Sequence, residues 1–118
     1  MTPELCVQSI HGADGVLNVR CTGTVGIGSK SNASVHPAKE AVADWMSEHP
    51  DDRVQEIILD FTEVDYQWGD APASCFLPSV REGVQRFRFL AGPGSAPALA
   101  SLVETANVPW FSVERAGT

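Results

Sequence analysis

Residues 54–61 read VQEIILDF, a nearly continuous apolar run with an Asp-Asp pair before it and a Thr-Glu pair after it. A short apolar run with these boundaries is typical of a strand that is buried on both faces, as in a parallel sheet. The sequence therefore predicts that residues 54–61 form the central strand of an α/β domain.

Upstream of this run, residues 5–10 (LCVQSI) and 16–22 (VLNVRCT) alternate in the manner of strands. The Asp14-Gly15 pair between them suits a tight turn, so the two segments predict an opening hairpin. Residues 23–35 are rich in Gly, Ser and Asn and predict a loop, with the strand extending at most to Val25.

A first helix is predicted over residues 36–49. Pro37 suits its first turn, Ser34 or His36 is the candidate N-cap, and Pro50 ends it. One face of this helix carries apolar residues at three- and four-residue intervals, namely Ala38, Ala41, Val42, Trp45 and Met46.

Downstream, residues 62–69 are expected to form a connection. The pattern then predicts a helix from Asp70 to about Val80 with a break at Pro78, a strand over 86–91, a helix over 96–106 and a strand over 108–113. The order is β-β-α-β-α-β-α-β, which predicts a mixed, mainly parallel sheet with helices packed against it and the hairpin as an antiparallel edge. We expect one α/β domain over residues 1–118.

The composition is that of a globular protein, with 43% hydrophobic and 19% charged residues. The net charge of −7, from 15 acids and 8 bases, repels phosphate backbones, so we expect no nucleic-acid partner and a bias toward neutral or basic proteins. No apolar run approaches the ~18 residues of a membrane span, and we expect no membrane insertion.

The three cysteines, Cys6, Cys21 and Cys75, are odd in number and lie in apolar surroundings, so we interpret them as reduced core thiols. The start of the chain, MTPELCVQSIHG, lacks a basic region followed by an apolar stretch and does not resemble a secretory signal. Both observations predict a cytoplasmic location.

Three short motifs add a family resemblance. They are Ile57-Ile58-Leu59-Asp60, Val64-Asp65-Tyr66 and Leu90-Ala91-Gly92-Pro93. Together with the order of elements, they resemble the STAS domain, a family that includes bacterial anti-sigma factor antagonists and the cytoplasmic domains of sulphate transporters. The likeness covers roughly residues 15–113. It implies a regulatory or scaffolding domain that binds a protein, such as an anti-sigma-type kinase or a sensor complex.

The chain departs from this family at its phosphorylation motif. Antagonist-type members carry Asp-Ser-Ser-Gly at the start of the second helix, where a kinase modifies a serine. The corresponding stretch here is Trp68-Gly69-Asp70-Ala71, which has no hydroxyl, and Asp70 stands at or beside the phosphoacceptor position. We therefore expect no ordinary serine switch. Ser74 and Ser79, on the same predicted helix, are candidate displaced phosphosites.

The predicted partner-binding residues follow the central strand, because a loop at the carboxyl end of a parallel strand opens onto the ligand-binding edge of the sheet. They are Asp65, Tyr66, Trp68, Gly69, Asp70, Ala71 and Ser74. An exposed Trp68 would anchor a partner and Asp70 would act as a fixed negative charge. The alternative is structural: Asp70 caps the helix, Gly69 supplies an unusual backbone angle and Trp68 packs inward.

Two other segments have functional and structural interpretations. Residues 23–31 (GTVGIGSKS) differ from a phosphate-binding P-loop, because Ser29 separates the last glycine from Lys30, and a surface loop is the better account. Glu40, Asp44 and Glu48 form an acidic stripe that is either a solvated helix face or a surface for a basic partner.

The residues that could carry catalysis or bind metal do not form a recognisable set. His11, His36 and His49 lack metal-ligand spacing, Cys75 lies on an apolar helix face, and Asp60 is better explained as a cap than as part of a cation site with Asp65 and Asp70. We expect no cofactor, no metal and no enzyme activity. Two alternatives stay open: a small enzyme using carboxylates at the strand-end cleft, and a self-assembling module or homodimer that buries Trp110, Phe111 or the hairpin.

Overall fold

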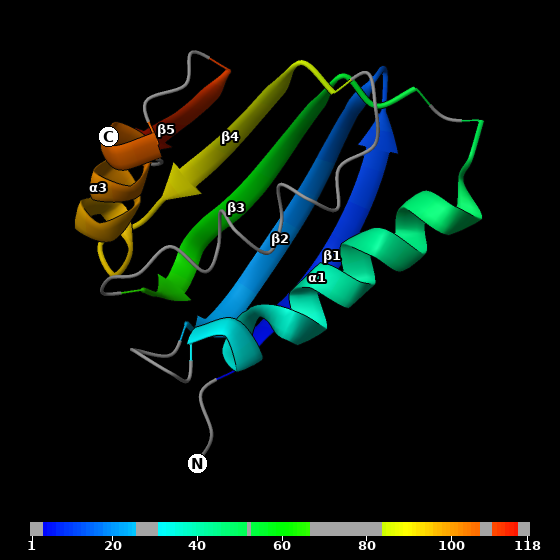
Figure 1. Cartoon of the computed structure of the whole chain (residues 1–118). Coiled ribbons are helices and arrows are strands. Elements are labelled where there is room, and N and C mark those ends of the chain that lie inside the picture. The colour runs from blue at the N-terminus through cyan, green and yellow to red at the C-terminus, as the bar shows by residue number, and fades with distance from the viewer. Residues whose placement is uncertain (1–3, 26–30, 52, 67–83, 107–109, 116–118) are drawn as a thin grey trace.

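Within the residues that the computed structural model describes, five strands form one sheet in the order β1-β2-β3-β4-β5 (Figure 1). The structure describes residues 4–25, 31–51, 53–66, 84–106 and 110–115. The elements are β1 (Leu5–Ala13), β2 (Val16–Thr24), α1 (Ser31–Glu48), β3 (Glu56–Asp65), β4 (Arg86–Ala91), α3 (Ala96–Ala106) and β5 (Phe111–Arg115). The helix predicted from Asp70 lies outside the described residues.

The sheet has the predicted mixture of strand directions. β1 and β2 pair antiparallel, while β2, β3, β4 and β5 are mutually parallel. The turn between β1 and β2 consists of Asp14 and Gly15, which have φ angles of 54° and 81°, the positive values that a tight two-residue hairpin turn requires. The predicted opening hairpin is therefore confirmed, and the chain is a compact α/β domain with a Cα radius of gyration of 13.2 Å.

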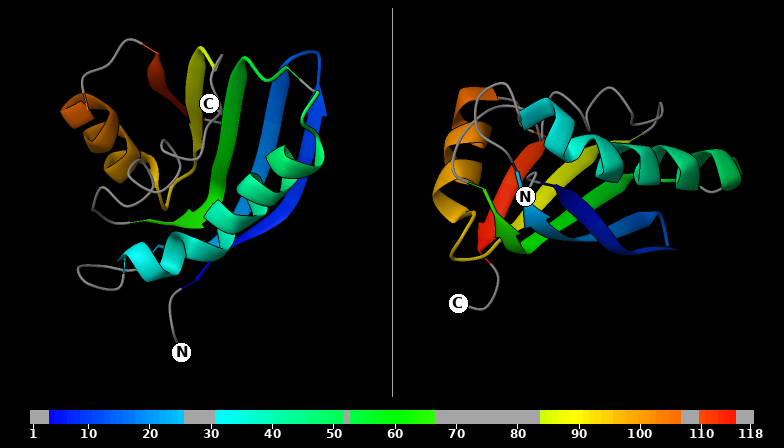
Figure 2. Two further views of the ribbon diagram at one scale, coloured as in Figure 1. Left: turned by 45° about the vertical axis from the view of Figure 1, so that its right-hand side comes forward. Right: turned by 90° about the horizontal axis from the view of Figure 1, so that it is seen from below.

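Both described helices lie on one side of the sheet (Figure 2), α1 over β1 and β2 and α3 over β4 and β5. Alternate strand residues point toward the helices and form the core, including Leu17, Val19, Cys21, Ile57, Leu59, Phe61, Phe87, Phe89 and Phe111. The rings of Phe61 on β3 and Phe89 on β4 meet edge to face with centroids 5.0 Å apart, and the ring of Phe111 on β5 stacks on Phe87 with centroids 5.7 Å apart. The core thus fixes how β3, β4 and β5 align.

Helix α1 begins at Ser31, five residues before the predicted start, so the prediction of a loop up to residue 35 was wrong. Val35 is fully buried and extends the apolar stripe of Ala38, Val42 and Met46 by one turn toward the amino terminus. Ser34 is buried inside the helix and does not cap it. Burial of this extra turn outweighs the hydrogen bond that Pro37 cannot donate.

Strand β3 continues through Asp65, whereas the sequence predicted a connection from residue 62. The pairing of β2 with β3 shifts register at this point, since Arg20 pairs with Asp60 and Thr22 pairs with Glu63. This β-bulge adds a residue to β3 and interrupts its alternation, which explains why the pattern suggested that the strand ended. β5 is also shifted, to Phe111–Arg115 from the predicted 108–113.

Strand β4 and helix α3 have the predicted bounds, 86–91 and 96–106. Each of these elements could be predicted from its own residues, because β4 alternates without a bulge and the apolar residues of α3 repeat without a proline kink. None of the described helices is both long and apolar enough to cross a lipid bilayer.

Candidate functional site

The carboxyl ends of β2, β3 and β4 meet at one end of the sheet, as parallel strands require, and the chain enters α1 and α3 there (Figure 1). We call the region formed by Thr24, Val25, Asp65, Tyr66 and residues 92–95 the carboxyl-end rim. The sequence analysis placed the candidate site at this end of the sheet. The described part of that site is built from three separate chain segments.

Backbone hydrogen bonds join these segments. The Val25 N–H donates to the Asp65 carbonyl oxygen (2.9 Å), and the Tyr66 N–H donates to the Gly94 carbonyl oxygen (2.9 Å). The end of β3 is therefore held on one side by the end of β2 and on the other by the turn that follows β4. Such bonds hold the main chain of the rim in one arrangement before any partner arrives.

The turn after β4 lies against β3 at close range. A Cβ atom built on Gly92 would be 2.1 Å from the Thr62 carbonyl oxygen, a distance that no other residue could tolerate. The same construction on Gly94 gives 3.2 Å from the Val64 carbonyl oxygen, which is tight but leaves room for small shifts. Gly92 thus permits the contact that places the turn at the rim.

Ser95 fastens this turn from inside. It is fully buried, its hydroxyl donates to the Phe61 carbonyl oxygen (3.0 Å), and the Gly92 N–H donates to its Oγ (3.1 Å). Its own carbonyl accepts the first helical bond, from Leu99 (3.0 Å), so Ser95 is also the N-cap of α3. The sequence analysis missed Ser95, although a serine directly before a predicted helix is an N-cap signal.

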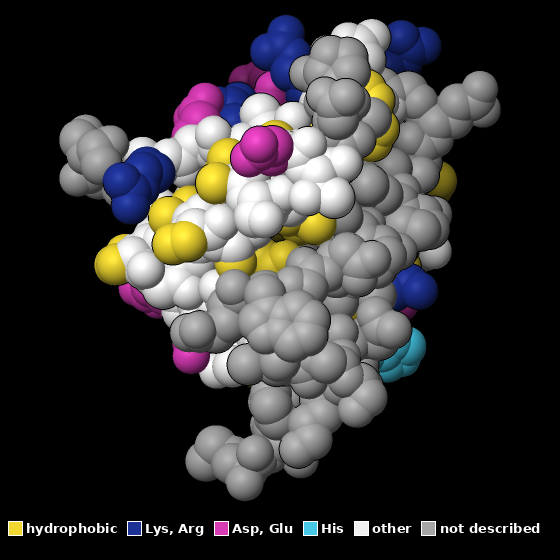
Figure 3. Space-filling model, turned by 60° about the vertical axis from the view of Figure 1, so that its left-hand side comes forward, with side chains coloured by type: hydrophobic (Ala, Val, Ile, Leu, Met, Phe, Trp, Pro, Cys, Tyr) yellow, Lys and Arg dark blue, Asp and Glu magenta, His cyan; other side chains and the backbone are white. Residues whose placement is uncertain are grey.

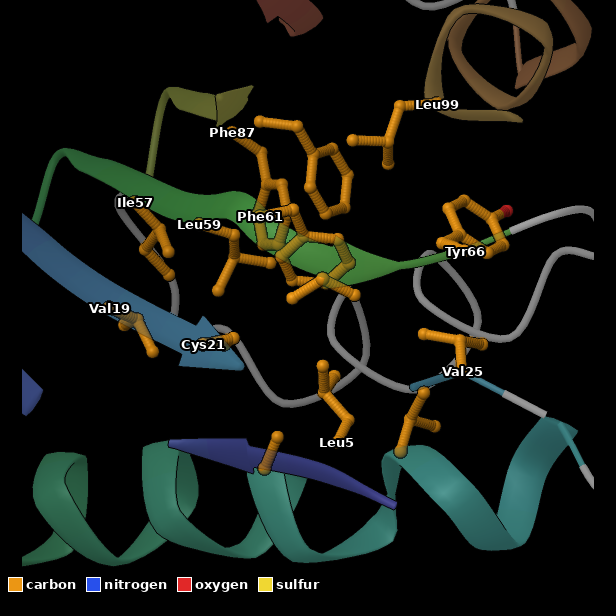
Figure 4. Packing of buried hydrophobic residues seen from close by; sticks show 14 of the residues in the cluster. Leu5, Val19, Cys21, Val25, Ile57, Leu59, Phe61, Tyr66, Phe87 and Leu99 are labelled. Atoms are coloured by element: carbon orange, nitrogen blue, oxygen red, sulfur yellow. The ribbon is translucent and has the colours of Figure 1, made fainter. Parts of the chain in front are cut away.

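The two predicted site residues that the structure describes have different environments. Asp65 is exposed at the rim. Tyr66 is only 2% exposed and joins the core cluster that contains Val25 and Leu99 (Figure 4), so it can support the rim but has almost no surface to offer a partner. The other predicted residues, Trp68, Gly69, Asp70, Ala71 and Ser74, lie outside the described residues.

Asp60, which was expected to cap a turn at the end of the strand, lies inside β3. Its Oδ1 accepts hydrogen bonds from the Thr62 backbone N–H (3.0 Å) and from the Thr62 hydroxyl (2.6 Å). It therefore stabilises the β-bulge, and the expectation of a strand-end cap was wrong.

The sequence analysis expected all the cysteines to be core thiols, and for Cys6 this was wrong. Cys21 is fully buried, and burial, helped by the negative field of Asp60, raises the pKa of its thiol to about 12. Cys6, in contrast, is exposed on β1. Cys75 lies outside the described residues. Across the described parts of the chain, no three His, Cys, Asp or Glu side chains gather in a way that could hold a metal ion.

The face of the sheet that the described helices leave open carries a ladder of ion pairs. Arg88 on β4 contacts Glu56 on β3 and also Glu114 on β5 (3.0 Å), and Arg20 on β2 contacts Glu63 on β3 (2.9 Å). The hydrogen bond with Glu56 is the main reason that the pKa of Arg88 is raised. These pairs bridge neighbouring strands and neutralise the acids nearest to them.

The acidic stripe on α1 is at the surface, as both of its interpretations, a solvated helix face and a surface for a basic partner, require. Glu40, Asp44 and Glu48 are exposed, and His36 lies 2.9 Å from Glu40. Residues 26–30 of the glycine-rich segment lie outside the described residues, while Gly23 and Thr24 end β2.

Comparison with known proteins adds no family to this geometry. No protein-family model matches the chain, and no curated protein matches it.

Proposed function

We propose that the chain is a regulatory or scaffolding domain that binds a partner protein through the carboxyl-end rim. This is the role that the resemblance to STAS domains implies, here without the serine switch of the antagonist-type members. An anti-sigma-type kinase or a sensor complex is the proposed class of partner.

One observation carries the proposal: the rim holds an exposed acid on a main chain that is already fixed. Asp65 ends β3, its carbonyl accepts the Val25 N–H, and the next residue donates to Gly94. A surface that is ordered before binding loses little conformational entropy when a partner docks, which favours specific protein recognition.

The exposure pattern at the rim suits a protein surface. Asp65, Pro93 and Gly94 are exposed, while Val25 and Ser95 directly behind them are buried. The exposed groups offer a carboxylate beside an apolar ring. This combination fits a partner that presents a basic residue beside an apolar contact.

The sequence that follows the rim supports constant docking rather than docking that is switched by phosphorylation. The segment Trp68–Ala71, which follows this rim in the sequence, has no hydroxyl to modify and contributes one further acid, Asp70. Ser74 is then the nearest candidate for regulation. If Ser74 is the regulatory site, Ser74→Glu will weaken partner binding and Ser74→Ala will not.

Charge reversal tests the proposed function. The tagged chain would be used to capture partners from a native lysate, and the captured proteins would be quantified by mass spectrometry for the native chain, Asp65→Arg and Asp44→Arg. Asp44 is the control, because it is also an exposed acid but lies on α1 in the acidic stripe, so its variant separates docking through the rim from docking through the stripe.

We expect Asp65→Arg to lose at least one specific partner by tenfold or more, and Asp44→Arg to retain it. Circular dichroism and thermal melting would establish that both variants fold. Equal capture by folded Asp65→Arg and by the native chain would overturn the proposal.

A further inference from the structure

A hollow opens between helix α3 and strand β5. Its volume is about 310 Å³, and it is lined by Ala91, Ala96, Pro97, Ala100, Val113 and Arg115. Five of these six residues are apolar, and the sixth carries a guanidinium. Figure 3 views the molecule from this side and shows hydrophobic side chains grouped there. The hollow is therefore an apolar surface with one cationic group.

Short side chains on the helix and alternation on the strand create this space. Ala96 and Ala100 are four residues apart on α3, so they lie on the same face of the helix, and Ala91 ends β4 beside them. Side chains alternate along β5, so Val113 and Arg115 both lie on the side of the sheet that carries α3. Because an alanine side chain ends at Cβ, the gap between helix and strand is left open.

The hollow has an apolar floor and a polar mouth. Ala91 and Ala96 are buried, Val113 is half-buried, and Ala100 and Arg115 are exposed. A bound molecule would therefore place apolar atoms against the floor and a polar group at the mouth, beside the guanidinium and the solvent. Apolar walls with one or a few placed polar groups are the usual composition of small-molecule sites.

The guanidinium of Arg115 determines which polar group fits the mouth. It carries five N–H donors in a planar fork that matches the two oxygens of a carboxylate. Arg115 also has an interaction within the chain, which the fork can keep, because a carboxylate engages only two of the five donors. Glu114, the acid of β5, points to the open face of the sheet, where it lies 3.0 Å from Arg88. The charge at the mouth is therefore complementary to an anion.

We propose that this hollow binds a small carboxylate with an apolar body, of the kind represented by a medium-chain fatty acid. The apolar body lies against Ala91, Ala96 and Val113, and the carboxylate pairs with Arg115. This is a second site on the domain, and it does not depend on docking through the carboxyl-end rim, because Asp65 does not line the hollow.

The size of the hollow favours a small molecule over a protein. Sites for small molecules typically measure about 300–1,000 Å³, and a hollow of about 310 Å³ lies at the lower end of that range. A stable protein interface buries about 800 Å² on each partner, which the three apolar side chains that reach the surface here, those of Pro97, Ala100 and Val113, do not provide.

Titration of the intact, isotope-labelled chain with octanoate, followed by NMR, tests the site. We expect saturable shifts of the Ala96, Ala100 and Val113 amides, with a dissociation constant of roughly 1 mM for so small a ligand. At equal concentration, octanol should shift these amides about tenfold less, because it has the same apolar chain but no charge to pair with Arg115. Shifts that do not saturate, shifts centred away from α3 and β5, or equal effects of octanol and octanoate would overturn the proposal.

Two pairs of variants test the mouth and the floor separately. Arg115→Gln should weaken octanoate binding by about tenfold or more, whereas Arg20→Gln, which removes an exposed arginine from the open face of the sheet, should leave it unchanged. Ala100→Leu fills the hollow and should weaken binding by a similar factor. Ser101→Leu is its matched control, because it adds the same side chain at the neighbouring exposed position, which does not line the hollow. Equal affinities within either pair of folded variants would contradict the site.

The Asp65→Arg variant separates this proposal from docking through the rim. Octanoate should bind the folded Asp65→Arg chain as tightly as the native chain, whether or not that variant loses a protein partner. Circular dichroism and thermal melting would establish that each variant folds. Loss of octanoate binding in folded Asp65→Arg would contradict the placement of the ligand between α3 and β5.

Discussion

Replacing Ser95 with alanine removes the hydroxyl that ties the turn after β4 to the central strand. The hydroxyl makes two hydrogen bonds, one accepted from the Gly92 N–H at 3.1 Å and one donated to the Phe61 carbonyl oxygen at 3.0 Å. Both bonds are buried. Ser95→Ala therefore leaves the Gly92 N–H without its buried hydroxyl acceptor.

The magnitude follows from these losses. A buried group that loses its hydrogen-bond partner costs about 1–3 kcal/mol, and the second bond contributes about 1 kcal/mol. We expect Ser95→Ala to lower the free energy of unfolding by about 2–4 kcal/mol, a large share of the ~5–15 kcal/mol that stabilises a typical domain. The melting temperature should fall by roughly 8–15 °C for a chain of this size.

Urea denaturation followed by tryptophan fluorescence measures this change. Ser101→Ala is the matched control, because Ser101 is exposed on the same helix and its loss should change stability by less than about 0.5 kcal/mol. A loss of less than about 0.5 kcal/mol for Ser95→Ala, equal to the control, would refute the reasoning that Ser95 holds the rim together.

Three further results are expected. Gly92→Ala should destabilise the fold by more than about 3 kcal/mol, or prevent folding, while Gly94→Ala should cost far less. The reason is that a Cβ atom at Gly92 would lie 2.1 Å from a carbonyl oxygen, whereas one at Gly94 would lie 3.2 Å from one. Equal stability of the two variants in thermal melts would contradict this. The Cys21 thiol should resist a thiol reagent at pH 8 while Cys6 reacts. Because burial raises the pKa of Cys21 from 9.0 to about 12, the contribution of this thiol to stability should be complete below pH 9 and should disappear as the pH rises toward 12. Urea titrations across this range would show the loss. Arg88→Met should lower the free energy of unfolding by about 1–2 kcal/mol, because it leaves two carboxylates on the sheet without their shared arginine, and a melt unchanged from the native chain would argue against a stabilising ladder.

The parts of the fold that depend on local sequence could be predicted. The Asp14-Gly15 turn follows from the backbone freedom of its two residues, and α3 and β4 follow from regular apolar spacing. These signals need no knowledge of neighbouring elements. The bounds of β4 and α3 were accordingly predicted to the residue.

The parts of the fold that depend on tertiary contacts could not be predicted from the sequence. The extension of β3 to Asp65 relies on a bulge stabilised by Asp60, and the early start of α1 relies on burial of Val35 against the sheet. Neither is visible in the alternation of a single segment. The same holds for the Arg88 ladder, because cross-strand partners are known only once the register is fixed.

For the same reason, the sequence indicated only some of the residues that the structure brings together at the rim. The rule that sites lie beyond the carboxyl ends of parallel strands led to the end of β3, where Asp65 is exposed. It did not distinguish Asp65 from Tyr66, which is buried. It also missed Ser95 and Gly92, whose contribution is to hold the rim through contacts with a strand some thirty residues earlier.

Site-specific photo-cross-linking tests the proposed docking surface most directly. A benzophenone amino acid would replace Pro93, which is exposed at the rim beside Asp65, or, in a parallel sample, Asn18, which is exposed on the open face of the sheet. Docking through the rim predicts that irradiation in native lysate yields a discrete cross-linked protein from position 93 and none of the same mass from position 18. Cross-linking of that protein from position 18 alone would contradict it.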